Sequence, residues 1–549
     1  MPVRATYPGV YINEVKSRVR TITGVPTSIA AFVGAAPRGP ADRPVHITSW
    51  GDYETQFGGL NVDSPMSYAV HQFYLNGGAE AEIVRLVPQQ AKTVEFRVGK
   101  KSQGDDKRPL LRAASAGKWA LSLRARVDHD NIPDGEDQLY NLTLRDCGTG
   151  AEESYRNISA DSTSPRSLKK VLSGSRLVVV ADEGQGRPQA HDAPKRSSDD
   201  PLACPPEGGE PGAAQAEGSN GDGEGEGEAQ LDLFSAPDVP TGEQPDESTL
   251  VAGDYLGSAA AKTGIHQLLK TDIFNLLCLP ECPPEALTDA LELCIERRAI
   301  LLVDPPTAWS DGSLDLNGIA RNALNNMPVR GDSAKNAALY FPRVMVPDRR
   351  RDGEIRAFPP CGVMAGVLAR TDAQRGVWKA PAGTDASLNG VIGLEMPLTD
   401  RENGMLNPLG VNCLRQLPVL GPVAWGARTA RGADRLADEW KYLPVRRLAL
   451  FVEESLFRGT QWVVFEPNDE PLWSSIRLNV GAFMNSLFRE GAFQGRTPDE
   501  AYLVKCDREN NPQNDVDRGI VNIQVGFAPL KPAEFVIIHI EQLAGQIQT

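Results

Sequence analysis

The chain has 549 residues and a formal net charge of −15, with 41% hydrophobic and 23% charged residues. The length exceeds the roughly 250–300 residues at which a single core stops growing, and the composition excludes a fibrous or wholly disordered chain. The negative charge lies between residues 197 and 250, which hold 14 Asp or Glu and no Lys or Arg; the rest carries 57 basic and 58 acidic side chains. The charge therefore describes one segment, and the remaining surface is close to neutral.

Residues 1–25 are expected to form an extended N-terminal arm. Pro8 and Gly9 are turn residues, and Pro8 suits the start or edge of a strand because it has no N–H to donate. The segment has no adjacent hairpin partner. Its β-forming residues are Tyr7, Val10, Tyr11, Ile12 and Val15.

The start of the chain lacks the apolar core of a signal peptide, and no run approaches the ~18–20 apolar residues that span a bilayer. The eight cysteines are too sparse for a disulfide scaffold. We therefore expect a soluble protein assembled in a reducing cytoplasm, which can leave the cell by lysis or as part of a larger particle.

Residues 26–90 and 91–182 differ in pattern. The first range predicts buried strands at 29–34 and 82–87 around a helix at 67–76. The second range predicts an inserted, mostly β domain, because turn clusters separate short β-like runs. These runs lie at 94–98, 119–123, 140–144 and 177–180.

Residues 183–250 are of low complexity and rich in Gly, Pro and acidic residues. Such a segment buries too little apolar surface to offset the entropy of ordering it. We expect a disordered surface loop, which is either a simple spacer or a segment with a role that the sequence does not identify.

Residues 251–400 alternate between strand and helix patterns, and residues 401–532 continue this alternation. A mixed sheet with flanking helices is expected, which is an α/β (α+β) fold. The predicted elements are strands at 273–279, 299–303, 337–346 and 519–527 and helices at 287–295, 314–325 and 472–488.

The C-terminal arm, residues 533–549, contains a predicted strand at 534–540 that is apolar on both faces. A strand of this kind must be covered on both sides. It could pair within the chain or add to the sheet of a neighbouring copy, and the pattern leaves both open. Its apolar residues are Phe535, Val536, Ile537, Ile538 and Ile540.

Two patterns superficially suggest a ligand site. The segment 257–263 resembles a phosphate-binding loop but lacks the glycine before Lys262, and a linker rather than a buried strand precedes it. Cys278, Cys282 and Cys294 lie close in sequence, but Cys278 and Cys294 are in apolar patterns and no histidine is spaced as a fourth ligand. Buried structural thiols are the favoured interpretation.

Two further features could indicate functional residues. Asp304 ends a strand, where α/β enzymes often place catalytic groups, but the prolines that follow favour a turn-forming role. The tripeptide Arg330-Gly331-Asp332 matches an integrin-binding motif, which would require a secreted adhesin. The six histidines do not cluster, and neither a nucleophile elbow nor a zinc-protease motif is present. No catalytic, cofactor-binding or metal-ligating set is predicted, and an α/β hydrolase-like enzyme with a β-rich appendage is the alternative.

The chain resembles the contractile tail sheath family of phages, R-type bacteriocins and contractile injection systems. The resemblance begins at residues 7–11 with Glu14 and is strongest in the second half, where many motifs occur in colinear order. These motifs lie at 294–306, 358–367, 369–372, 376–383, 423–429, 463–468 and 525–535.

The resemblance implies hexameric rings of copies stacked helically around an inner tube, with baseplate and terminal cap proteins as further partners. It also implies that both arms donate strands to a neighbour's sheet, that the C-terminal domain faces inward and that the 91–182 domain lies on the outer surface. Nucleic acid, membrane insertion and cofactors are not implied.

Overall fold

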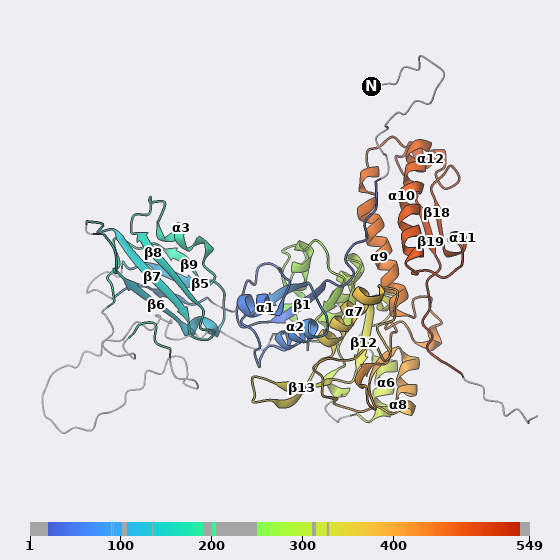
Figure 1. Ribbon diagram of the computed structural model, residues 1–549, viewed down its shortest axis with the longest axis horizontal. Helices are drawn as coiled ribbons and strands as arrows, with labels where there is room; N and C mark the ends of the chain where they lie inside the picture. Colours follow the sequence, from blue (N-terminus) through green and yellow to red (C-terminus); the bar gives the residue numbers. More distant parts are fainter. Residues whose placement is uncertain are drawn as a thin grey trace, which may run out of the picture.

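The computed structural model describes residues 20–88, 91, 93–100, 107–133, 135–191, 200–204, 250–309, 314–326 and 329–537. Within these ranges Figure 1 shows a central α/β body, a β-rich lobe on one side of it and a helical lobe above it. Some predicted arm residues lie outside the described residues, as does most of the acidic segment. These arm residues are Tyr7, Val10, Tyr11, Ile12, Val15, Ile538 and Ile540.

The body is built on a mixed sheet, which confirms the predicted α/β class. Among the described residues its strand order is β17–β16–β12–β11–β10–β1–β3–β2. The central strands pair in parallel, while β17 and β2 are antiparallel at the two edges. The strands are β1 (Ala30–Ala35), β2 (Val45–Ile47), β3 (Ala81–Leu86), β10 (Leu276–Cys278), β11 (Ile300–Val303), β12 (Ala337–Phe341), β16 (Val411–Leu417) and β17 (Gly421–Ala424).

Helices cover both faces of this sheet because its strands are apolar on both sides. Along β1, Phe32 packs into the core on one face and Val33 into the core on the other. The first face is covered by α1 (Trp50–Phe57), α2 (Pro65–Leu75) and α7 (Cys361–Arg375), and the second by α4 (Ala252–Leu256), α5 (Ala286–Glu296), α6 (Leu316–Asn326) and α8 (Asp400–Leu406).

The predicted strand at 337–346 is in fact two strands in different sheets. β12 ends at Phe341, and Pro342 follows it. Because proline has no N–H, it cannot continue the ladder. The chain then enters a smaller sheet of β13 (Val344–Asp348), β14 (Glu354–Phe358) and β15 (Gly393–Leu394).

The β-rich lobe has its own hydrophobic core between two small sheets. The predicted β-run at 119–123 is wrong, because residues Lys118–Ser122 form a 3₁₀ helix and the strand starts at Leu123. The lobe contains β4 (Glu95–Arg97), β5 (Leu110–Ala113) and β9 (Val178–Asp182), then β6 (Leu123–Asp128), β7 (Leu139–Asp146) and β8 (Glu152–Ser159), with α3 (Leu168–Val171).

A disulfide joins Cys147, just after β7, to Cys204. The sequence did not indicate this bond, because 57 positions separate the two residues and no motif marks them. The pair fastens the first part of the acidic segment to the β-rich lobe.

The helical lobe is packed around α9 (Leu443–Gly459) and α10 (Glu470–Arg489), so the predicted helix at 472–488 is confirmed. β16 and β17 extend the body sheet although they lie within the range 401–532. We therefore propose that the C-terminal domain begins near residue 442 rather than 401. The lobe also contains α11 (Pro498–Ala501), β18 (Tyr502–Lys505), α12 (Gln513–Asp517) and β19 (Gln524–Phe527).

The first of the two predicted closing strands, 519–527, is limited to β19. The described part of the second, residues 534–537, carries no strand, and its residues 538–540 lie outside the described residues. A strand exists only where a neighbour pairs with it, and no described part of this chain lies alongside residues 531–537 as a ladder partner.

Candidate functional site

The C-terminal segment is anchored to the body by the side chain of Glu534. Glu534 Oε1 accepts hydrogen bonds from Arg428 Nε at 2.6 Å and from Asn407 Nδ2 at 3.0 Å. Glu534 Oε2 accepts from Arg428 Nη2 at 2.7 Å and from the Tyr442 hydroxyl at 3.2 Å. A two-bond arginine–carboxylate pair fixes both the distance and the orientation of its partners. We call this set the Glu534 clamp.

Arg428 is itself rigidly held, since its side chain is fully buried. Its Nη1 donates to the backbone carbonyl of Asn407 at 2.9 Å and to Asp434 Oδ1 at 2.9 Å. Its backbone N–H donates to Asn412 Oδ1, on β16, at 2.6 Å. Because Tyr442 directly precedes α9, the clamp joins the body sheet, the helical lobe and the C-terminal segment.

The opposite charges of Arg428 and Glu534 each stabilise the ionised form of the other group. Burial alone would lower the pKa of Arg428, but the nearby Glu534 and Asp434 outweigh it and the pKa rises above its usual value. Burial alone would raise the pKa of Glu534, but hydrogen bonds from Arg428 and Asn407 outweigh it and the pKa falls. Both groups therefore remain ionised at neutral pH.

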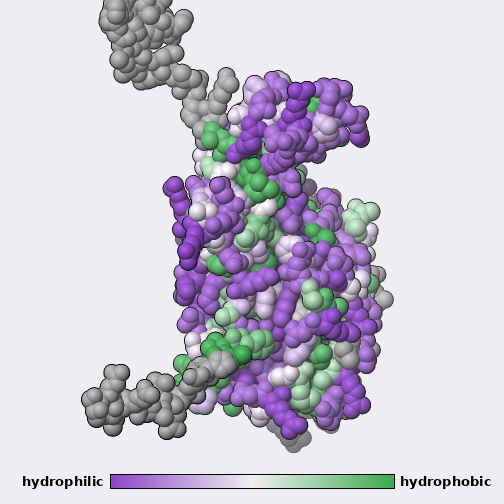
Figure 2. All heavy atoms as spheres, turned by 90° about the vertical axis from the view of Figure 1, so that its right-hand side faces the viewer, coloured by the Kyte–Doolittle hydropathy of each residue, from purple (hydrophilic) through white to green (hydrophobic). Residues whose placement is uncertain are grey.

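Beyond the clamp the chain leaves the molecule as an exposed apolar segment. Phe535, Val536 and Ile537 are 72%, 80% and 78% exposed. Figure 2 shows hydrophobic side chains gathered beside the point where the described chain ends. Three consecutive exposed apolar residues after a buried anchor are typical of a segment that another surface covers.

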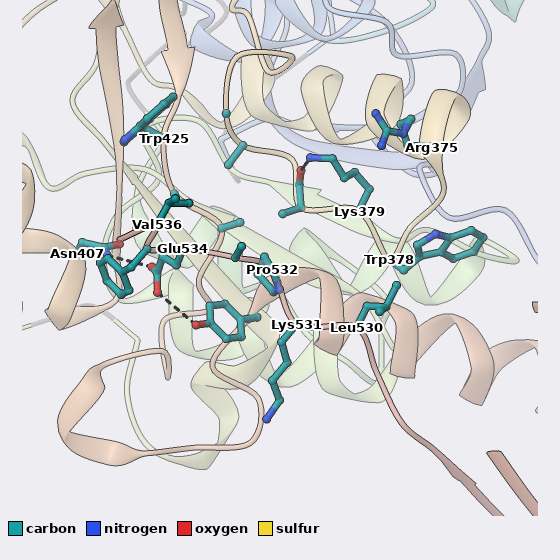
Figure 3. A pocket seen from close by; sticks show the side chains of 18 of the residues that line it. Arg375, Trp378, Lys379, Asn407, Trp425, Leu530, Lys531, Pro532, Glu534 and Val536 are labelled. Carbon is teal, nitrogen blue, oxygen red and sulfur yellow. Dashed lines mark hydrogen bonds between the residues drawn. The ribbon is translucent and has the colours of Figure 1, made fainter. Parts of the chain in front are cut away.

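A cavity of about 950 Å³ lies beside this exit. Figure 3 shows Glu534 directed toward Asn407 on one side of the cavity. Tyr442, which donates to Glu534, also lines the cavity. Trp378 and Trp425 lie on other parts of the wall. The wall is thus made by the body, the start of α9 and the C-terminal segment together.

The N-terminal segment is anchored to the helical lobe. The guanidinium of Arg20 lies 4.8 Å from the centre of the Trp462 ring, and its backbone N–H donates to Asn479 Oδ1 at 3.1 Å. Ile22 is buried against Gly459, where a Cβ would lie only 2.5 Å from the Ile22 side chain. Glycine is therefore required at 459 for this close approach.

The next residues follow α9 down into the body. The backbone N–H of Val25 donates to Ser455 Oγ at 3.2 Å. The backbone carbonyl of Thr27 accepts from Arg447 Nη2 at 2.9 Å, and Arg447 forms a buried ion pair with Asp372 at 2.6 Å. Residues 20–27 are thus held by both the helical lobe and the body. Figure 1 shows α9, along which they run, reaching the top of the helical lobe.

The helical lobe also contains the antiparallel ribbon of β18 and β19 (Figure 1). Within the described residues each strand forms a ladder only with the other, so the ribbon has two open edges. Just beyond the end of β19, Pro529 forms an isolated bridge with Phe493. One face packs on the lobe core, with the rings of Tyr502 and Phe527 against Phe493. Leu503 points the other way and is 53% exposed. An open edge offers unpaired backbone N–H and C=O groups to an added strand.

The structure separates the predicted arm residues into two groups. Phe535, Val536 and Ile537 lie exposed at the exit, while the others lie outside the described residues. Arg428 and Glu534 were missed as functional residues. The available signal was a charged residue directly before an apolar strand pattern, together with an arginine inside the 423–429 motif.

The candidates for enzyme chemistry have structural explanations. Asp304 Oδ1 accepts from the backbone N–H of Cys361 at 2.9 Å, at the start of α7. Its Oδ2 is buried with no hydrogen-bond partner among the described residues, and burial raises the pKa of Asp304 to about 7. Cys278 and Cys294 lie in the two body cores, and burial raises the pKa of Cys294.

The residues of the two short motifs, 257–263 and 330–332, also form contacts within the chain. In the loop at 257–263, the backbone N–H of Thr263 donates to the Ser258 carbonyl at 3.1 Å, and Ser258 N–H donates to Thr263 Oγ1 at 3.0 Å. Asp332 pairs with Lys335 at 2.7 Å and with Arg431 at 3.7 Å. The described residues contain no group of metal-ligating side chains. No helix within the described ranges has the length and hydropathy to cross a membrane.

Comparisons with known proteins point in one direction. Residues 437–542 match the phage tail sheath C-terminal domain. The tail sheath protein of Vibrio phage KVP40 is 26% identical over 185 residues, which are 34% of this chain and 26% of that protein. A putative prophage major tail sheath protein of Pseudomonas aeruginosa is 24% identical over 310 residues, or 54% of this chain and 73% of that protein.

Solved structures match over nearly the whole chain. The contracted PVC sheath complex, from an extracellular contractile injection system, has a TM-score of 0.56 at 20% identity and covers 98% of this chain and 99% of that one. The contracted helical sheath of the anti-feeding prophage has a TM-score of 0.52 at 22% identity, with the same coverage. The shared fold and the sequence matches agree: the chain is similar to contractile tail sheath proteins, and its residues 437–542 match the sheath C-terminal domain.

Proposed function

We propose that this chain is a structural subunit that polymerises with copies of itself around an inner tube and contracts to drive the tube through a target envelope. The observation that carries the proposal is the arrangement of the helical lobe. Both chain ends are anchored at their roots, one by residues 20–27 and one by the Glu534 clamp, and the lobe holds a ribbon with open edges.

Strand addition explains why such a lobe would link copies. The ribbon has two edges, and the chain has two apolar, β-forming ends. If each end pairs with a ribbon of another copy, backbone hydrogen bonds give the link and the apolar side chains become buried. Each buried side chain of this size contributes ~1.5–3 kcal/mol before entropy. Repeated through a polymer, these links would form a mesh.

Chain ends that are anchored where they leave the body also suit contraction. During contraction the bodies would rotate and repack, while the arms stay paired and bend between the root and the added strand. The extended sheath would be a metastable state behind a kinetic barrier, and repacking would release free energy without nucleotide hydrolysis. In this proposal the chain works by assembly rather than by catalysis.

The relatives indicate the setting. Similar proteins occur in phage tails and in an extracellular contractile injection system, and one similar structure is a baseplate of the anti-feeding prophage. We propose corresponding partners for this chain: further copies of itself, a baseplate, an inner tube and a terminal cap. Assembly in the cytoplasm followed by release in a particle fits this set, with the Cys147–Cys204 disulfide forming after release into an oxidising environment.

The test uses full-length protein and two truncations that spare the anchors. Deleting residues 1–19 or residues 535–549 removes an arm but keeps Arg20 and Glu534 in place. Each variant should stay folded by thermal unfolding and should form no tubes by negative-stain electron microscopy, whereas deletion of 205–249 should still form them. Full-length tubes from either truncation would contradict the role of that arm. Uniform small particles from the intact chain would contradict the sheath function and favour the enzyme alternative.

A further inference from the structure

The most exposed apolar side chain of the helical lobe belongs to a strained residue. Phe465 is 102% exposed and has φ +69°, a left-handed backbone conformation that bulky residues rarely adopt. Val464 beside it is 62% exposed. Strain of this kind persists only where surrounding structure imposes it, and it concentrates at functional positions. We call Val464 and Phe465 the apolar knob.

Hydrogen bonds hold the backbone around the apolar knob in place. The backbone N–H of Glu466 donates to the Val463 carbonyl at 3.1 Å, which closes the turn. Asn468 Nδ2 donates to the Ile520 carbonyl at 3.0 Å, and Asn468 Oδ1 accepts from Trp473 Nε1 at 2.8 Å. Because the backbone of this turn is held in place, little backbone entropy is lost when a partner buries Val464 and Phe465.

The cavity beside the Glu534 clamp complements the knob. Its wall includes Trp378, Trp425 and Leu530, and Trp425 and Leu530 are 38% and 40% exposed. A volume of about 950 Å³ is in the range that holds ligands larger than two side chains. An aromatic ring gains from packing edge-on or offset against indole rings.

The charges around the two features are also complementary. The knob is followed by exposed acidic residues, Glu466 and Glu470. The cavity is lined by Arg375, Lys379 and Lys531, together with Glu490 and with Glu534, whose charge Arg428 neutralises. Opposite charges at the rim of a contact favour one orientation and exclude others.

The two features lie at opposite ends of α9. Tyr442, on the cavity wall, precedes this helix, and the knob follows its far end. The helix has 17 residues and therefore a length of about 26 Å, and Figure 1 shows it running from the body to the top of the lobe. A knob and a cavity on distant parts of one chain can meet in a two-fold pair, where each knob enters the cavity of the other copy, or in a head-to-tail contact, which propagates as an open assembly. The stacked copies of the proposed function require the head-to-tail contact.

We propose that Val464 and Phe465 of one copy insert into the cavity beside the Glu534 clamp of a second copy. This contact rests on the proposed function, because it requires stacked copies, but it is separate from strand exchange by the arms. It would lock the bodies of neighbouring copies in register, next to the exit of the C-terminal arm.

The direct test places a photo-crosslinking phenylalanine derivative at position 465 in tubes made from isotopically light and heavy copies. Crosslinks between light and heavy chains should map to residues 375–383, 425–427 or 530–536. The same derivative at Ile355, which is 54% exposed on β14, is the control and should not give these peptides. Crosslinks from position 465 that map elsewhere, or only within one chain, in normal tubes would overturn the knob contact and leave the proposed function standing.

A second variant separates assembly from folding. Phe465→Gly removes the ring and relieves the strained backbone, so the subunit should unfold at the same or a higher temperature. The concentration needed for tube formation should rise by about tenfold or more, as for loss of a central aromatic anchor, whereas Ile355→Ala should leave it unchanged. An unchanged concentration for Phe465→Gly would overturn the contact. Failure of the unaltered chain to form tubes would instead overturn the proposed function.

Discussion

The Glu534 clamp gives the sharpest quantitative expectation. Glu534→Ala removes two charge-assisted bonds to Arg428 and leaves that buried guanidinium with Asp434 as its remaining carboxylate partner. Breaking a fully buried ion pair costs about 3–5 kcal/mol. Since Glu534 is 19% exposed and Asp434 stays, we expect a loss of about 2 kcal/mol.

This loss weakens the attachment of the C-terminal segment to the body, so it should lower the unfolding temperature of the subunit as well as weaken assembly. The clamp fixes the point from which Phe535 projects, so releasing it adds freedom that must be removed when the arm binds a neighbour. A cost of about 2 kcal/mol corresponds to about a 30-fold higher concentration for tube formation. Glu534→Gln keeps the shape and part of the hydrogen bonding and should cost about 1 kcal/mol, or about fivefold.

The assay is sedimentation of tubes across a concentration series, with thermal unfolding of the unassembled subunit as the folding control. Asp272→Asn is the matched control, because Asp272 pairs with Arg458 at 2.8 Å but is 82% exposed. It should change the threshold by less than about fivefold, since exposed ion pairs contribute about 0–1 kcal/mol. Equal thresholds for Glu534→Ala, Asp272→Asn and the unaltered chain would refute the clamp as the organiser of the C-terminal arm.

Three further expectations follow from the body and the β-rich lobe. Because burial raises the pKa of Asp304 to about 7, its contribution to stability is full below about pH 4 and is lost as the pH rises through 7. Asp304→Asn should therefore stabilise the subunit by about 1–3 kcal/mol at pH 8 and little at pH 4, and equal unfolding temperatures at pH 8 would contradict the burial argument. Replacing Cys147 and Cys204 by serine should destabilise the β-rich lobe by about 2–4 kcal/mol in thermal unfolding without a reductant, while tubes still form; an unchanged lobe would show that the bond is not formed. Deleting 205–249, just beyond Cys204, should leave the tube threshold within about twofold, and loss of tubes would show that the acidic segment takes part in assembly.

The fold class could be predicted from local patterns because each helix and strand of the body shows a regular spacing of apolar residues. The helix at 287–295 and the strand at 299–303 bury one helix face and both strand faces, and such periodicity is visible in any short window. The prediction of one continuous strand at 337–346 was wrong because a single proline redirects the chain into a second sheet. The predicted β-run at 119–123 was wrong because Trp119 and Leu121 are β-formers whose conformation is set by the lobe around them. These residues lie in the 3₁₀ helix Lys118–Ser122.

Only part of the candidate site could be predicted from the sequence. The apolar run starting at Phe535 identified the C-terminal exit, because exposed hydrophobic residues in a strand pattern require a partner. The Glu534 clamp could not be predicted, since Arg428 lies 106 positions away and only the folded chain brings them together. The strained geometry of Phe465 was equally hidden, because backbone angles at one residue leave no signature in its neighbours.

The central claim is that the two chain ends pair with the β18–β19 ribbon of other copies. Cryo-electron microscopy of tubes formed by the full-length protein tests it most directly, because the chain can be traced outward from Glu534 and from Arg20. We expect residues from 535 onward, and residues before 20, to lie as added strands along the two open edges of ribbons in neighbouring copies. Chain ends that fold back onto their own ribbon, or ribbons whose edges stay unpaired in the tube, would contradict the account.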